Sequence, residues 1–170
     1  NWKFKITKYK TFKYSNYWKN KLETLHTKNT DSISKIDIKY GELLAKTINI
    51  FLANEKVDFI ASHGHTIFHQ PENNFTLQIG NGQTIANITK IKTINNFRNL
   101  DVSLGGQGAP LVPIGDLYLF HEYKYCVNLG GFANISIKQK HEIIAFDICP
   151  VNIVMNEISK KLLLDFDKNG

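Results

Sequence analysis

The chain has few of the residues that mark a specialised protein. Its 170 residues include two cysteines, four prolines and one arginine, and no stretch approaches 18 consecutive apolar residues. A membrane-spanning helix needs about that many, so we expect no membrane partner. Cys126 and Cys149 lack metal-ligand spacing, which predicts reduced core thiols. The first residues alternate apolar side chains with lysine, unlike a secretory signal, and a cytoplasmic location is expected.

Basic residues outnumber acidic ones by 21 to 15, which gives a net charge of +6. Such an excess raises nucleic-acid binding as a hypothesis. The lysines are densest between Lys3 and Lys28 and otherwise scattered, and no stretch has the aromatic and basic spacing of an RNA-binding sheet. We therefore expect no nucleic-acid partner. The 42% apolar composition is typical of a soluble globular protein.

Apolar periodicity predicts an α/β protein in which alternating strands and helices are followed by a β-meander. The expected elements are a half-buried strand in residues 1–14, helices at 17–25 and 38–54, strands at 57–61 and 75–79, a helix at 83–88, a strand at 92–97, a helix at 112–122, a meander at 125–147 and a helix at 151–164. The change of pattern near residue 123 predicts two domains, residues 1–122 and 123–170.

A carboxylate followed by a glycine-rich loop is the strongest candidate site. Asp101 precedes Gly105, Gly106, Gln107 and Gly108, and the apolar run that follows predicts a helix. Glycine lets main-chain N–H groups approach a ligand closely, and a helix N-terminus favours an anion or sugar hydroxyls. Asp101 is then a candidate general base. In the alternative, Asp101 caps a turn and the glycines form a flexible connection.

The arginine lies three residues before this carboxylate. Arg98 is the single arginine among 21 basic residues. In a chain that otherwise uses lysine, it predicts a planar, bidentate contact that lysine cannot supply. The alternative is a chance residue on a solvated face.

Three histidines form a second candidate. An extended backbone places His63 and His65 on one face, and His69 follows. Zinc needs at least one further ligand at a recognisable spacing, and the sequence offers none. Histidines that line a polar cleft are therefore favoured over a metal site.

Two more segments combine turn residues with polar side chains. Gly130 and Gly131 separate two strand-like runs. In one interpretation the N–H groups of this turn and Asn134 bind phosphates; in the other the turn is purely structural. Asp147 ends a strand-like run, and Pro150 is expected to start a helix. Asp147 either caps that helix or orients a substrate or a hydrated metal.

Taken in this order, the motifs resemble those of one family, the anhydro-N-acetylmuramic acid kinases. The matching segments are His63-Gly64-His65-Thr66, Thr76-Leu77-Gln78-Ile79-Gly80, the run from Asn96 to Pro113, the run from Asn128 to Ser136, and Asp147-Ile148-Cys149-Pro150-Val151-Asn152. The part from Gly105 to Pro113 is the most specific. Details of the first and last segments are similar to a Bacteroidetes-like branch.

The resemblance implies a fold and a reaction. The family has the two-lobed fold of sugar kinases, Hsp70 and actin. It uses ATP with Mg²⁺ to open the 1,6-anhydro ring of an amino sugar with water and to phosphorylate the 6-oxygen. Asp101 matches the base that deprotonates the water, and no metal ligand is assigned. The sugar is assigned to Arg98, His63, residues 105–108, Asp147 and Asn152, and the nucleotide to Gly130, Gly131 and Asn134.

The chain departs from the family pattern in several places. His65 stands where the family has Gln, Asn96 where it has Asp, and residues 147–152 lack two glycines. The N-terminal Gly-Thr-Ser-x-Asp-Gly motif and the part that closes over adenosine are not in these residues, so we expect an interior fragment that is inactive alone. The alternatives are a non-catalytic sugar-binding remnant and a metal hydrolase built on His63, His65 and His69. The sequence leaves the oligomeric state open, a homodimer included.

Overall fold

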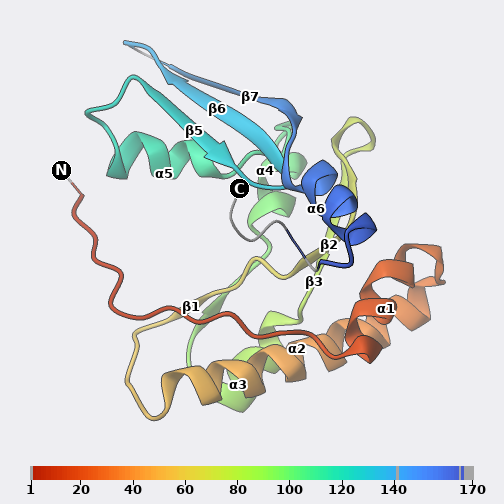
Figure 1. Cartoon of the computed structure of the whole chain (residues 1–170). Coiled ribbons are helices and arrows are strands. Elements are labelled where there is room, and N and C mark those ends of the chain that lie inside the picture. Colours follow the sequence, from red (N-terminus) through yellow and green to blue (C-terminus); the bar gives the residue numbers. More distant parts are fainter. Residues whose placement is uncertain (1, 141, 165, 167–170) are drawn as a thin grey trace. The chain divides into compact units, whose positions relative to one another are not determined.

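The chain has a mixed α/β structure, seen in a computed structural model that describes residues 2–140, 142–164 and 166 (Figure 1). Contacts divide it into two compact units. The larger unit is Ile6–Ala109, and the smaller unit is Pro110–Gly170 together with Asn1–Lys5. The chain therefore passes between the units twice. The lobe boundary expected near residue 123 stays a prediction.

The larger unit is made of helices and short strands. In chain order these are α1 (Asn16–Thr24), α2 (Thr30–Leu52), β1 (Ile60–Ala61), β2 (His65–Gln70), β3 (Phe75–Ile79), α3 (Gly82–Thr89), β4 (Thr93–Ile94) and α4 (Phe97–Ser103), with 3-10 turns at Leu25–Thr27 and Pro71–Asn73. Strand β1 pairs in parallel with β4, and β2 pairs antiparallel with β3.

The core of the larger unit is formed by α1, α2 and β3. Helix α2 begins at Thr30 because the Asn29 side chain accepts a hydrogen bond from the Ser32 N–H at 3.0 Å. It starts well before the expected range of 38–54, because polar residues interrupt the apolar pattern of its first turns. The buried core residues are Leu22, Leu25, Ile33, Ile36, Tyr40 and Ile79.

Several expected strands are absent or short. Residues 2–14 form no strand, and Trp2 and Ile6 are 69% and 72% exposed. Alternation alone does not make a strand, because the backbone also needs a neighbour to pair with. The strands expected at 57–61 and 92–97 shrink to β1 and β4, which pair with each other over two residues each.

The smaller unit is built on the expected meander. It contains an antiparallel sheet of three strands in the order β5 (Tyr125–Leu129), β6 (Phe132–Lys138) and β7 (Ile143–Pro150). In the sequence, α5 (Val112–Leu119) precedes this sheet and α6 (Asn152–Lys161) follows it. Pro150 ends β7 and does not start the helix. Cys126 is partly buried and Cys149 is exposed, so the expectation of core cysteines is wrong.

Side chains from both ends of the smaller unit contact α5 and the turn after it. The Lys138 ammonium donates hydrogen bonds to the carbonyl oxygens of Phe120 and of Tyr123, the latter at 2.7 Å. A cation is favoured at a helix C-terminus. The Trp2 and Tyr118 rings lie 5.7 Å apart, and Phe4 meets Phe120 at 5.8 Å.

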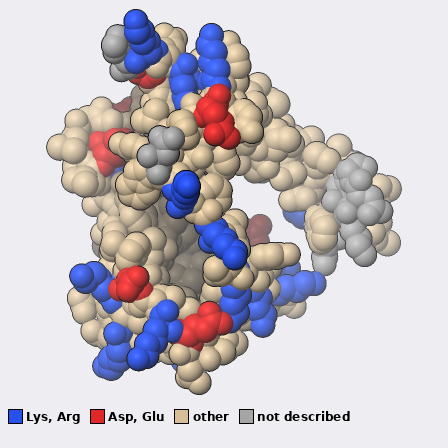
Figure 2. All heavy atoms as spheres, turned by 90° about the vertical axis from the view of Figure 1, so that its left-hand side faces the viewer, with Lys and Arg blue, Asp and Glu red and all other residues tan. Residues whose placement is uncertain are grey.

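The surface carries mixed charge in the view of Figure 2. Lysine and arginine side chains stand there in separate groups, with acidic side chains between them. Among the described residues, no helix is long and apolar enough to cross a membrane.

Candidate functional site

The segment that carries Arg98 and Asp101 is a helix rather than a loop. Helix α4 ends at Ser103, and Gly105 follows with a left-handed φ of +87°. The Gly105 N–H donates to the Val102 carbonyl at 3.0 Å, and the Gly106 N–H to the Asp101 carbonyl at 2.8 Å. These are the paired bonds of a Schellman motif. The first glycines therefore end α4, whereas the sequence pattern alone left ligand binding and a structural turn both open.

Asp101 braces the loop that follows α4. Its Oδ2 accepts a hydrogen bond from the Gly108 N–H at 2.6 Å, and a Cβ at Gly106 would lie 2.3 Å from the same oxygen. Three of the four N–H groups in residues 105–108 thus face α4. Within the described residues, the Gln107 N–H and Asp101 Oδ1 have no partner. The expected cradle of glycine N–H groups is not formed, and the loop offers a ligand the exposed Gln107 and one carboxylate oxygen.

Arg98 joins this loop to a second segment. Its Nη1 donates to the Gly108 carbonyl at 2.7 Å, and its Nε donates to Nε2 of His63 at 2.8 Å. Partial burial lowers the pKa of the guanidinium from its usual value, but arginine remains a cation at neutral pH. Arg98 thus makes a planar, two-armed contact with protein atoms, and its Nη2 has no partner among the described residues.

The three candidate histidines have separate partners. His63 binds Arg98, the His65 ring packs 6.3 Å from that of Tyr40, and Nδ1 of His69 lies 3.1 Å from the Thr76 hydroxyl. Burial lowers the pKa of His65, and the neighbouring His63 lowers it further. No three His, Cys, Asp or Glu side chains in the described part of the chain lie close enough to hold a metal. The metal-hydrolase alternative therefore has no ligand set there.

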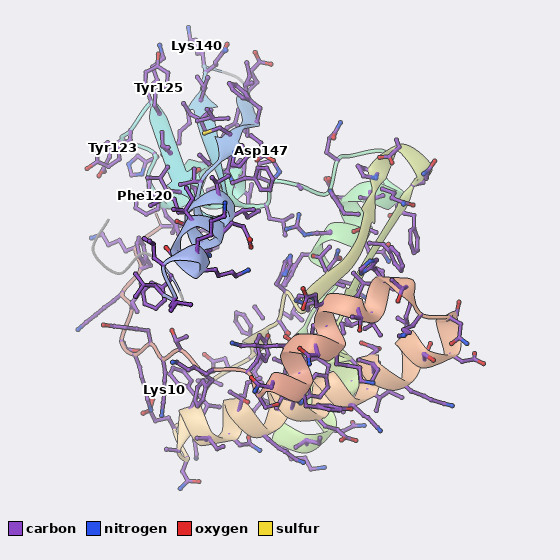
Figure 3. The ribbon with its side chains drawn as sticks, turned by 45° about the vertical axis from the view of Figure 1, so that its right-hand side comes forward. Lys10, Phe120, Tyr123, Tyr125, Lys140 and Asp147 are labelled. Carbon is purple, nitrogen blue, oxygen red and sulfur yellow. The ribbon has the colours of Figure 1, made fainter. Side chains whose placement is uncertain are left out.

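Strand register in the smaller unit places three polar side chains in a line, which we call the polar row. Asn128 of β5 lies opposite Asn134 of β6, which lies opposite Asp147 of β7. Directly opposed residues point to the same face of an antiparallel sheet. Asp147, labelled in Figure 3, is exposed, and its carboxylate has no hydrogen-bond partner among the described residues.

The turn between β5 and β6 is fastened to the start of α6. The Gly131 carbonyl accepts from the Val151 N–H at 2.8 Å, and the Gly130 carbonyl accepts from the Asn152 N–H at 3.2 Å. Helix α6 has no side-chain cap, so Asp147 does not serve as one. The Gly131 N–H donates to nothing in the described residues, and the Asn152 side chain is exposed.

A second braced turn, which sequence reasoning missed, centres on Asp37 of α2. Its Oδ1 accepts from the Gly80 N–H at 2.7 Å, and its Oδ2 accepts from Nδ2 of Asn81 at 3.1 Å. Asn81 in turn accepts from the Thr84 N–H at 2.9 Å and caps α3. An asparagine before a helix is a readable cap signal. Asp37 gives no such signal, because its partners lie 43 and 44 residues along the chain.

Comparison with known proteins identifies the family. The model of the anhydro-N-acetylmuramic acid kinase family matches residues 3–170. An anhydro-N-acetylmuramic acid kinase of Bacillus cereus (strain ATCC 14579) is 35% identical over 189 residues, which cover 99% of this chain and 48% of the relative. One of Clostridioides difficile (strain 630) is 40% identical over 162 residues, or 84% of this chain and 42% of the relative. The chain spans about half the length of the curated relatives it matches, and it belongs to the anhydro-N-acetylmuramic acid kinase family.

Proposed function

We propose that this chain is part of an ATP-dependent, cytoplasmic kinase that converts 1,6-anhydro-N-acetylmuramic acid and water into N-acetylmuramic acid 6-phosphate in peptidoglycan recycling. Family membership supports the reaction. The observation that carries the proposal is the linked set His63, Arg98, Gly108 and Asp101, because it fixes a cation and a carboxylate beside one loop. Phosphoryl transfer depends on such positioning and charge. We also propose the two-lobed actin-like fold, with lobes at 1–122 and 123–170.

In the proposed reaction, water adds to the anomeric carbon as the bond between C1 and O6 breaks. Oδ1 of Asp101 takes the proton of the water, and O6 bonds to the γ-phosphorus of ATP while ADP leaves. The lone pairs of Oδ1 support this role, since Oδ2 already accepts from Gly108. Losing a general base costs roughly a hundredfold or more in rate.

The polar row and the neighbouring turn are the proposed phosphate site. The Gly131 N–H and the Asn134 amide are donors for phosphate oxygens, and Gly130 keeps the turn free of side chains. Asn128 lies opposite Asn134 in the row, and Asp147 is assigned to the sugar, so no metal ligand is assigned here. A bound Mg²⁺ would neutralise phosphate charge at this site.

The proposed sugar contacts are groups that have no protein partner within the part of the chain that the structure describes. Nη2 of Arg98 and the Gln107 side chain are offered by the larger unit, and Asp147 and Asn152 by the smaller one. The glycines of residues 105–108 contribute by shaping the loop that carries Gln107. His63 is a weaker candidate for a direct sugar contact, because its Nε2 already accepts from Arg98.

The test compares Asp101→Asn with Asp147→Asn in the protein made from the complete reading frame. Transfer of labelled phosphate from ATP to the anhydro sugar is measured, and sugar binding is followed by calorimetry. We expect Asp101→Asn to lower turnover at least about a hundredfold with sugar affinity within a few-fold. Asp147→Asn is expected to weaken sugar binding instead.

Other outcomes separate the alternatives. A large loss of turnover in Asp147→Asn with a mild effect of Asp101→Asn would indicate that Asp147 is the base, since its carboxylate has no partner among the described residues. Sugar binding without any phosphate transfer by the wild-type protein would favour the non-catalytic remnant. If the wild-type protein shows neither sugar binding nor phosphate transfer, the kinase proposal is wrong.

A further inference from the structure

We propose that His63 is a positioning residue that acts through Arg98 and makes sugar binding sensitive to pH. The link to sugar binding rests on the proposed function, and the link between the two side chains rests on geometry alone. His63 follows β1, and Arg98 lies 35 residues further along on α4. One hydrogen bond of 2.8 Å joins them, so the loop after α4 is tied to a distant segment of the same unit.

The hydrogen bonds define the protonation state of the imidazole. Arg98 Nε can only donate, so Nε2 of His63 must present a lone pair. The proton of the neutral ring is then on Nδ1, which lies 3.1 Å from the Gly64 carbonyl and donates to it. Both ring nitrogens are satisfied only in this tautomer. The arrangement therefore requires a neutral His63.

The backbone that follows His63 is packed against the end of β3. Gly64 has a left-handed φ of +72°, and a Cβ there would lie 2.2 Å from the Ile79 carbonyl oxygen at the end of β3. Glycine alone allows this approach. Because Ile79 is buried and Gly80 is held by Asp37, the backbone at Gly64 is tied to the core, while the His63 side chain is exposed and is held by its two hydrogen bonds.

Arg98 transmits that position to the loop. With Nε held by His63, the guanidinium plane is oriented so that Nη1 reaches the Gly108 carbonyl. Gly108 is held from its other side by Asp101 Oδ2. One chain of hydrogen bonds thus runs from His63 to the proposed catalytic carboxylate and orients Nη2, the donor left for a ligand.

Protonation of His63 would break this chain. A protonated Nε2 becomes a donor that faces the Nε–H donor of Arg98, and two cations are then in contact. The ionisable neighbours are Arg98 and Asp101 on α4 and His65 on β2; Asp101 is the anion among them, and its Oδ2 is held by Gly108. We therefore expect sugar affinity to fall at a pH low enough to protonate His63.

The first experiment uses His63→Ala and His63→Gln in the complete protein, with His69→Gln as the matched control. Glutamine offers an acceptor oxygen near the place of Nε2 but does not titrate. We expect His63→Ala to raise the KM for the sugar about tenfold at pH 7.5 with kcat within about threefold, as for a lost hydrogen bond to a charged group. His63→Gln should restore the KM to within about twofold and abolish its rise between pH 7.5 and 5.5. His69→Gln should leave both unchanged.

A wild-type KM in His63→Ala, or a KM in His63→Gln as poor as in His63→Ala, would overturn the proposal. So would a KM that rises at low pH in His63→Gln as it does in the wild type.

The second experiment needs no activity. In ¹⁵N-labelled protein, long-range correlation spectra report which ring nitrogen of His63 is protonated, and the Gly108 amide reports the loop. We expect the Nδ1–H tautomer at pH 7.5 and a Gly108 amide shift that follows the titration of His63, lost in His63→Gln. A Gly108 amide that ignores this titration refutes the coupling. Coupling without any phosphate transfer would leave the His63 link standing and defeat only the kinase proposal.

Discussion

The loop at residues 105–108 and the turn at Gly130 and Gly131 use glycine in different ways. In the loop, Gly108 has a φ of +67° and a Cβ would lie 2.6 Å from the Val102 side chain. At the turn, neither glycine has a positive φ, and a Cβ on Gly131 would come no closer than 3.3 Å to Ile153. A side chain at Gly108 would therefore meet both a strained backbone and a clash, whereas one at Gly131 would meet only a tight contact with a side chain.

The polar side chains near the two segments also differ in how strongly protein atoms hold them. Beside the loop, Asp101 and Arg98 are held by protein atoms, while Asp147 in the polar row has no partner among the described residues. Side chains that are held by protein atoms are preorganised for ligand binding. Side chains without such partners become ordered only when a ligand binds. Substitutions in the loop should therefore change stability, and substitutions in the polar row should change binding.

The largest expected effect is at Gly108. We predict that Gly108→Ala lowers the free energy of unfolding by about 2–4 kcal/mol, because a side chain must enter the left-handed region and press on Val102. Gly131→Ala should cost less, about 1 kcal/mol, because its φ is not positive and the Ile153 side chain, 3.3 Å from the added Cβ, needs to move by only a few tenths of an ångström. Urea unfolding followed by circular dichroism measures both. Equal losses of unfolding free energy in the two variants would show that the loop and turn glycines do not differ in their structural role.

The next effect is at Asp37, which braces the turn after β3. Asp37→Ala is expected to cost about 1–3 kcal/mol, because it leaves the Gly80 N–H and the Asn81 amide without their acceptor. Asp58→Ala is the control, because Asp58 is exposed and has no partner among the described residues. Fluorescence of Trp18, which packs against Tyr40, reports unfolding of this unit. A loss at Asp58 as large as that at Asp37 would contradict the brace.

A smaller effect is expected from pH at His65. Its pKa is lowered in the folded state by burial and by His63, so the unfolded chain binds the proton more readily. The free energy of unfolding should therefore fall as pH drops through about 6.5, the usual value, and level off below the folded pKa. His65→Gln should flatten this dependence in urea titrations at pH 7.5 and 5. An unchanged slope would remove His65 as its source.

The smallest stability effect is expected in the polar row. Asp147→Asn should change the free energy of unfolding by less than about 0.5 kcal/mol, because its carboxylate has no hydrogen bond to lose among the described residues. The same variant is expected to weaken sugar binding in the complete protein. A destabilisation above 1 kcal/mol would mean that the carboxylate has a structural role and that the contrast between the two regions fails.

Local patterns predicted the parts of the fold whose partners are near in sequence. The meander was predicted because each strand pairs with the next one along the chain, and α1 and β3 carry clear periodicity. Helix α4 was missed because Gly105 was interpreted as part of a ligand-binding loop. A glycine at that position is also a signal that a helix ends just before it. Residues 2–14 have the alternation of a strand but no neighbour to pair with.

The site was predicted as residue types but not as contacts. Asp101, Arg98 and His63 were all chosen from the sequence, yet each was expected to touch ligand. The hydrogen bond between Arg98 and His63 joins residues 35 apart, and nothing in either segment encodes the other. Long-range contacts of this kind depend on the packing of β2, β3 and α4, which a single sequence does not reveal.

The double passage of the chain between its two units affects how a protease would dissect it. One passage lies between Ala109 and Pro110, and the other follows Lys5, a residue that trypsin recognises. Cleavage after Lys5 would cut that passage and leave Trp2 and Phe4 joined to the smaller unit by their ring contacts with Tyr118 and Phe120. Such contacts supply about 0.5–1.5 kcal/mol each beyond the area they bury, which is weak compared with an intact backbone. A single cut would thus turn a molecule whose units are joined by two chain passages into one whose units are joined by a single passage.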